Sequence, residues 1–63
     1  MYSFIWLCRM MQERTEVVLL GGDNKTYYGL VNGIAVDDGS GRNWIVSMAL
    51  VGGGYKTILV KAE

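Results

Sequence analysis

Residues 26–36 read TYYGLVNGIAV, and this stretch decides the fold. Aromatic and β-branched side chains dominate it, which is typical of β-strands. The run is too long for one flat strand, and Gly29 and Gly33 lie inside it. Glycine within a strand commonly marks a bulge or a sharp bend. We therefore predict one strongly bent strand that contributes to both halves of a small barrel.

Outward from this stretch, similar apolar and β-branched runs occur at residues 16–20, 44–51 and 55–60. The chain has no proline, so Gly, Asn and Asp are the residues that mark its turns. They cluster at residues 21–24, 37–41 and 52–54, between the runs, and predict tight turns there. The pattern predicts a mainly β fold over residues 1–63. This fold is a single domain with a small, strongly bent antiparallel sheet or open barrel.

The first segment allows two interpretations. Met1, Phe4, Ile5, Cys8 and Met11 follow a helical stripe, whereas every second residue from 2 to 10 also alternates like a strand. The Met-Met-Gln-Glu-Arg end of the segment favours helix. We expect a short N-terminal helix packed over one mouth of the barrel.

The small size of the chain predicts self-association. A domain of about 60 residues buries only about 60% of the surface of its unfolded chain, and such domains usually rely on disulfides, a metal or oligomerisation. Cys8 is the only cysteine and histidine is absent, which excludes an internal disulfide and a structural zinc site. Apolar residues make up 51% of the chain. We therefore expect a homo-oligomer with apolar seams.

The net charge, the N-terminal segment and the single cysteine indicate which partners and which compartment to expect. The chain has six basic and six acidic residues, which argues against strong charge-driven binding to nucleic acid or anionic membrane. Residues 1–11 lack a basic start and a cleavage site, and are about half the length that spans a bilayer. One cysteine suits a reducing, cytoplasmic compartment, and the proline-free chain suits a bacterial or phage source.

No catalytic constellation is visible. The commonest general base is missing, and Cys8 has no histidine partner. Asp37 and Asp38 do not match calcium-loop spacing, and the glycines at 52–54 lack the lysine of a P-loop. We predict that the protein is not an enzyme and uses no cofactor or metal.

Two segments together resemble the Sm/LSm family of small β-barrels. Tyr27, Gly29, Val31 and Ile34 match the first half of the family signature, and residues 50–58 are similar to the second half. The N-terminal segment stands where the family has its short helix. The resemblance implies a ring of five to seven subunits that pair through edge strands and bind single-stranded RNA or DNA.

The sequence also departs from the family pattern. The acidic residue of the first half falls on Ala35, and the signature arginine falls on Val51. The segment between the turn at 37–41 and Gly52 is short for the two strands that the family has there. An SH3-like barrel that only contacts other proteins, as a structural or adaptor module, fits as well.

The resemblance implies that the loop at residues 37–44 and the turn at 52–54 line a pore. Arg42 would then contact phosphate, Asn43 would read a base edge, and Trp44 or Tyr55 would stack on a base. Gly53 and Lys56 would complete this nucleic-acid site from the turn. The alternatives are core or seam packing for the two aromatic residues and an ordinary solvated charge for the arginine.

Overall fold

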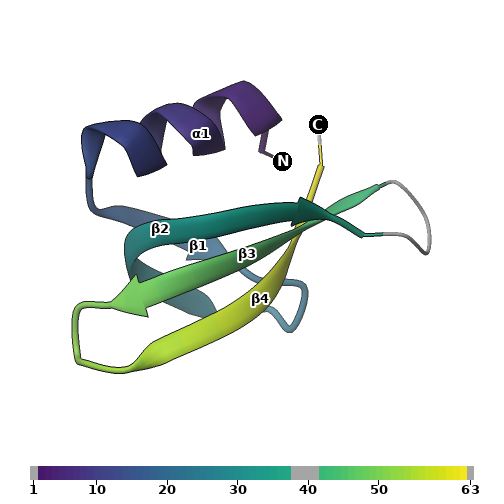
Figure 1. The fold of residues 1–63 in the computed structure, drawn as a ribbon. Helices are drawn as coiled ribbons and strands as arrows, with labels where there is room; N and C mark the ends of the chain where they lie inside the picture. The colour runs from purple at the N-terminus through teal and green to yellow at the C-terminus, as the bar shows by residue number, and fades with distance from the viewer. Residues whose placement is uncertain (1, 38–41, 63) are drawn as a thin grey trace.

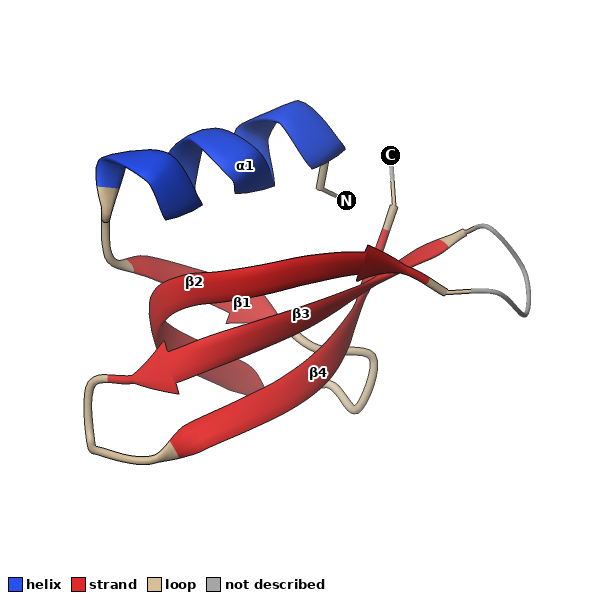
Figure 2. Ribbon diagram, viewed as in Figure 1, coloured by secondary structure: helices blue, strands red, loops and turns tan. Residues whose placement is uncertain are grey.

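The computed structural model describes residues 2–37 and 42–62, in which one helix precedes four strands (Figure 1). The elements are α1 (Phe4–Glu13), β1 (Val17–Leu20), β2 (Thr26–Val36), β3 (Asn43–Leu50) and β4 (Tyr55–Lys61). The strands form one antiparallel sheet in the order β1-β2-β3-β4 (Figure 2). Each strand thus pairs with its neighbour in sequence, which short turns favour.

The predicted fold class is confirmed: the protein is mainly β, with a strongly curled half-barrel sheet and one short N-terminal helix. Each strand lies within one or two residues of its predicted range. The interpretation of the first segment as helix is also confirmed. The predicted turn at 37–41 falls largely outside the described residues, which resume at Arg42.

Helix α1 has a defined start and end. The Ser3 hydroxyl accepts a hydrogen bond from the Trp6 amide at 3.1 Å, which caps the first turn. Arg14 adopts a left-handed conformation at φ 54°, and its amide reaches the carbonyls of Met10 and Met11. Figure 1 shows the helix lying across the open side of the curled sheet, where it packs on β2. Leu7 carries this packing, because it is completely buried.

Strand β2 bends in the middle, as its glycines predict (Figure 1). The register against β3 shifts between Val31 and Gly33, which leaves Asn32 as the extra residue of a bulge. Gly29 lies against β3 so closely that a Cβ there would stand 2.1 Å from the Ala49 carbonyl oxygen. The missing side chain therefore permits the close approach of these two strands.

The core is small and aliphatic. Its fully or nearly buried members are Leu7, Val17, Leu19, Val31, Val46, Met48, Ile58 and Val60. They alternate along β1, β3 and β4, as expected for strands with one face inward. Each contributes on the order of 1.5–3 kcal/mol through burial. The described aromatic residues lie around this core rather than inside it.

Tyr2 joins the helix to three strands. Its amide donates to the Lys61 carbonyl of β4 at 3.0 Å, and its hydroxyl accepts from the Leu20 amide of β1 at 2.9 Å. Its carbonyl accepts from the Trp44 indole N–H of β3 at 2.9 Å. Its ring stacks on Trp6, with 5.8 Å between the centroids. Tyr2 therefore fills the gap that the curled sheet leaves between β1 and β4.

One strand occupies the segment for which the family resemblance implies two. Strand β3 covers Asn43–Leu50 and continues through a turn at Gly52 to Gly54 directly into β4. Gly53 and Gly54 have φ of 101° and 81°, which glycine adopts without strain. The loops before and after β3 consequently lie at its opposite ends.

The close contact at Gly29 predicts unequal effects of alanine at the two β2 glycines. Gly29→Ala forces Cβ into the β3 backbone, and we expect a loss of about 3 kcal/mol or more, at the upper end of overpacking costs. Gly33→Ala is the matched control, since its Cβ would meet Ser47 at an ordinary 3.8 Å. We expect its stability to stay within about 1 kcal/mol of the native chain. Urea denaturation followed by circular dichroism measures both, and equal losses would contradict this account of the bend.

Candidate functional site

The outer edge of β4 is closed at one end and open at the other. The Leu59 carbonyl accepts from the Gly22 amide at 2.8 Å, and the Lys61 carbonyl accepts from the Tyr2 amide. The Ala62 amide instead bonds to the Arg42 carbonyl, on the side of β3. Main-chain groups of successive residues in a strand alternate between its two sides, so the even-numbered residues of β4 face β3 and the odd-numbered residues face outward. By this alternation, Tyr55 and Thr57 do so too. Within residues 2–37 and 42–62, no main-chain group bonds to their outer side.

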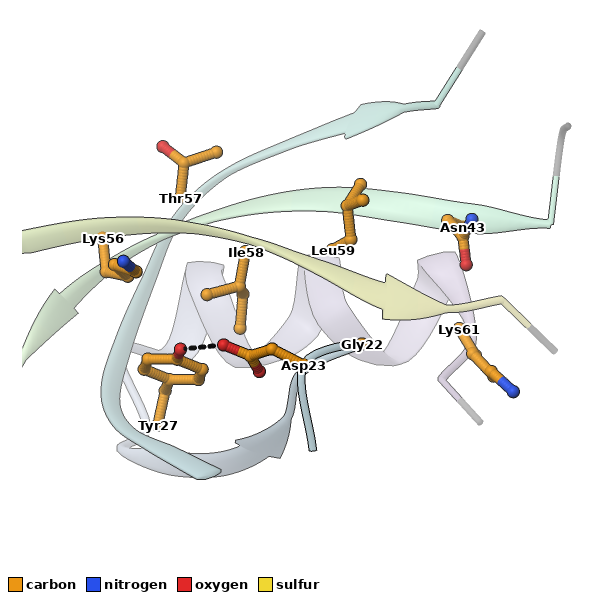
Figure 3. A pocket seen from close by; sticks show the side chains of 9 residues that line it. All are labelled: Gly22, Asp23, Tyr27, Asn43, Lys56, Thr57, Ile58, Leu59 and Lys61. Atoms are coloured by element: carbon orange, nitrogen blue, oxygen red, sulfur yellow. Dashed lines mark hydrogen bonds between the residues drawn. The ribbon is translucent and has the colours of Figure 1, made fainter. Parts of the chain in front are cut away.

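A groove of about 520 Å³ runs along this open edge (Figure 3). It lies between β4 and the β1–β2 turn, and its lining is mixed. The lining residues, polar and apolar together, are Gly22, Asp23, Tyr27, Asn43, Lys56, Thr57, Ile58, Leu59 and Lys61. We call this feature the β4 groove.

An ordered pair forms the wall of the β4 groove opposite the strand. The Tyr27 hydroxyl donates to the Asp23 carboxylate at 2.5 Å, and the Lys25 amide donates to the other carboxylate oxygen at 3.1 Å. The hydrogen bond from Tyr27, followed by that from Lys25, lowers the pKa of Asp23 below its ordinary value. The same bond raises the pKa of Tyr27, because the phenol is the donor. Asp23 is thus a charged acceptor, and each of its two oxygens already accepts one hydrogen bond.

Two lysines set the charge of the β4 groove. Lys56 and Lys61 lie towards opposite ends of it and are both exposed (Figure 3). Asp23 is the one described carboxylate among the lining residues. The described lining therefore carries two ammonium groups and one carboxylate, which is an excess of one positive charge.

Of the predicted nucleic-acid residues, the structure brings Asn43 and Lys56 together in one copy, where both line the β4 groove. Arg42, Asn43 and Trp44 lie at the start of β3, whereas Gly53, Tyr55 and Lys56 lie at and after its end. The register pairs Asn43 with Lys61 and Met48 with Lys56, so Asn43 and Lys56 are five residues apart along the hairpin, or roughly 17 Å at about 3.3 Å per residue. Within one copy, the predicted residues therefore form two groups near the two ends of β3, and Asn43 and Lys56 are linked by the groove that they share.

The first group is engaged within the fold. The Trp44 ring packs on Phe4 with 5.3 Å between centroids, and its N–H is bonded to Tyr2. The Asn43 side chain donates to the Asp37 carboxylate at 3.3 Å. Arg42 is exposed, and its carbonyl accepts a hydrogen bond from the Ala62 amide. The packing alternative for Trp44 thus describes what the structure shows of that residue.

The second group is open to solvent. Tyr55 is 79% exposed, the largest fraction among the described large hydrophobic residues that are exposed. A Cβ built on Gly53 would meet nothing within 4 Å. Lys56 is exposed and lines the β4 groove. These three residues are free to meet a ligand.

A second surface feature is apolar. Val18 of β1 and Tyr28 of β2 are directly paired, and the Val51 amide bonds to the Tyr28 carbonyl at 2.9 Å. All three side chains are about half exposed. The Tyr28 hydroxyl donates to Glu16, which raises the pKa of Tyr28. We call this row across β1, β2 and the end of β3 the outer patch.

The helix carries a separate apolar patch. Phe4, Ile5 and Trp6 are exposed, with Ile5 at 73%. We call these three residues the helix patch. Sequence reasoning missed the Asp23–Tyr27 pair and both patches. The alternation along residues 17–20 was the available signal for Val18, since every second residue of an amphipathic strand faces outward.

Comparison with protein-family models, with curated proteins and with solved structures found no match to this chain. The resemblance to the Sm/LSm family therefore remains a prediction. In the described part of the chain, no helix is long and apolar enough to cross a membrane. Nor do three or more metal-ligating side chains gather among residues 2–37 and 42–62.

The lowered pKa of Asp23 predicts an acid-sensitive contribution to stability. A carboxyl whose pKa is lower in the folded chain stabilises it above the ordinary value of 3.8, and this contribution is lost as the pH falls through the lowered value. We expect Asp23→Asn and Tyr27→Phe each to be less stable than the native chain at neutral pH. Both should lose less stability on acidification below about pH 4. Denaturation across a pH series measures this, and variant curves parallel to the native curve would contradict it.

Proposed function

We propose that this protein is a non-catalytic module that assembles with copies of itself. The observation that carries the proposal is the pair of apolar surfaces, the outer patch and the helix patch. The accessible surface of 4265 Å² is close to the roughly 4,000 Å² expected for a compact monomer of 7.0 kDa. The exposed apolar side chains are thus not the result of loose folding, and they are available to a partner.

The two patches support a head-to-tail contact. They are different surfaces on different elements, so a contact between them is heterologous and closes into a ring when the rotation permits. The Tyr28 hydroxyl already has an acceptor in Glu16, so its ring can be covered without leaving that group unsatisfied. A standard interface buries about 800 Å² per partner, or about a fifth of this surface. We propose a ring of five to seven copies in a cytoplasmic compartment.

Two charge insertions and a mixing experiment test this arrangement. Val18→Lys disables the outer patch and Ile5→Lys disables the helix patch. Each variant alone should be a monomer by native mass spectrometry, since a buried lysine weakens the contact about tenfold or more. Mixed together, they retain one intact contact and should form a 1:1 dimer.

The native chain should give a discrete closed oligomer in the same experiment. Gln12→Lys is the control, because this exposed helical residue is already polar and lies outside both patches. A native chain that stays monomeric over a wide concentration range would refute self-assembly. An isologous dimer that survives Ile5→Lys would refute the head-to-tail contact.

A second candidate function is binding of single-stranded RNA or DNA at the β3–β4 turn. It is supported by the exposed ring of Tyr55 beside the Lys56 cation, next to open space at Gly53. Proteins hold single strands by aromatic stacking on the bases as well as by phosphate contacts, so a chain with no net charge can still bind them. Asn43 shares the β4 groove with Lys56 in one copy, whereas Arg42 would join such a site from a neighbouring copy in the ring.

A salt titration with labelled oligouridine and oligodeoxythymidine tests this candidate. Binding should weaken with salt, and Lys56→Ala should reduce the slope by about 0.7 if it contacts one phosphate. Tyr55→Ala should weaken binding at every salt concentration, by about 1–3 kcal/mol if the ring stacks on a base. Lys25→Ala serves as a control of equal charge change. Absence of binding at low salt would exclude the candidate.

A further inference from the structure

We propose that the β4 groove binds an extended acidic peptide, which adds to the sheet as a strand beside β4. This site is separate from both apolar patches and goes beyond self-assembly. The main-chain groups of Tyr55 and Thr57 point out from the free edge of β4, where Thr57 lines the groove and Tyr55 lies just beyond it, and no described main-chain group bonds to them there. A peptide in β conformation supplies alternating donors and acceptors at the spacing that such an edge requires.

The closed end of the edge defines where the added strand stops. The Leu59 and Lys61 carbonyls are taken by Gly22 and Tyr2. The available edge therefore runs from Tyr55 to the Leu59 amide, and the peptide continues past it only through side-chain contacts. The open edge from Tyr55 to Leu59 is roughly 13 Å long at 3.3 Å per residue, so about five peptide residues pair along it and a sixth approaches Lys61 through its side chain.

The lysines indicate the chemistry of the peptide. Lys56 and Lys61 are exposed near the two ends of the groove, while the Asp23 carboxylate between them is held by Tyr27 and Lys25. Carboxylates near both ends of the added strand would meet the two ammonium groups. Opposite charges on directly paired neighbouring strands attract and stabilise the pairing.

Two other occupants fit the edge less well. A second copy that presented its own β4 would bring lysines against lysines, and its β1 (Val17–Leu20) carries no carboxylate. A nucleic-acid backbone has phosphate acceptors but no regular row of donors for the Tyr55 and Thr57 carbonyls. The peptide is the occupant that satisfies both the main chain and the charges.

The probe is a labelled six-residue peptide, acetyl-Glu-Thr-Val-Thr-Val-Glu-amide, and its partner with lysine at both ends. Fluorescence anisotropy measures affinity, and amide chemical shifts locate the site. We expect the glutamate peptide to bind at least about tenfold more tightly than the lysine peptide. The double variant Lys56→Glu, Lys61→Glu should reverse the preference. Arg9→Glu on the helix, outside the groove, should leave it unchanged.

Two N-methylated glutamate peptides test the main-chain pairing without altering the protein. One carries N-methyl groups on its odd residues and the other on its even residues. In one of them the methyl groups face β4 and should abolish binding; in the other they face solvent and should be tolerated. Shifts should concentrate at Tyr55 and Thr57.

Several outcomes would overturn the proposal. Equal binding of the glutamate and lysine peptides would refute the charge assignment, and equal loss with both methylated peptides would refute strand addition. Oligodeoxythymidine shifting the same amides while the glutamate peptide does not would assign the groove to nucleic acid. Protection of the Thr57 amide from hydrogen exchange that increases with protein concentration, without any peptide, would assign the groove to a second copy. None of these outcomes depends on the assembly mass, so the two proposals fail separately.

Discussion

The structure depends on how a four-stranded sheet closes without a fifth strand. Strands β1 and β4 are the two edges, and the turn that follows β1 bonds to β4 from the Gly22 amide to the Leu59 carbonyl. Tyr2 bridges the rest of the gap, since it bonds to Leu20 on one edge and to Lys61 on the other. Closure at one end of β4 leaves its other end, at Tyr55 and Thr57, open. The groove, its lysines and the proposed strand addition all follow from this incomplete closure.

The curl also explains where the apolar residues lie. One helix and one side of a four-stranded sheet enclose room for a small aliphatic core, which Leu7 completes from α1. The remaining aromatic and branched residues stay on the outside, in the outer patch and the helix patch. Self-association is the usual way in which so small a domain gains further burial. Assembly and strand addition use different surfaces, so one copy can do both.

Local features of the sequence predicted the fold well. Gly29 and Gly33 predicted the bend in β2, and the glycine and Asn/Asp clusters at 21–24 and 52–54 predicted two turns, because each residue type has a local conformational cause. Periodicity alone left residues 2–11 open between helix and strand. The Ser3 cap and the burial of Leu7 are what make this segment a helix in the structure.

The site depended on features that are not local. The predicted residues at 42–44 and 53–56 lie near opposite ends of β3, and of these Asn43 and Lys56 line the same groove. The role of Tyr2 links positions far apart in the chain, and no pattern of spacing reveals it. Asp23 and Tyr27 looked like ordinary turn and strand residues. Their place in a groove follows from the curl that brings the β1–β2 turn beside β4.

Amide hydrogen exchange on the dilute, unliganded protein tests the incomplete closure of the sheet most directly. The account predicts slow exchange at Ile58 and Val60, which face β3, and at Gly22, which bonds to Leu59. It predicts fast exchange at Thr57, whose amide faces the open groove. Slow exchange at Thr57 together with fast exchange at Gly22 would contradict this view of the sheet. It would show that the edge is closed at Thr57, where we find it open, and open at Gly22, where we find it closed.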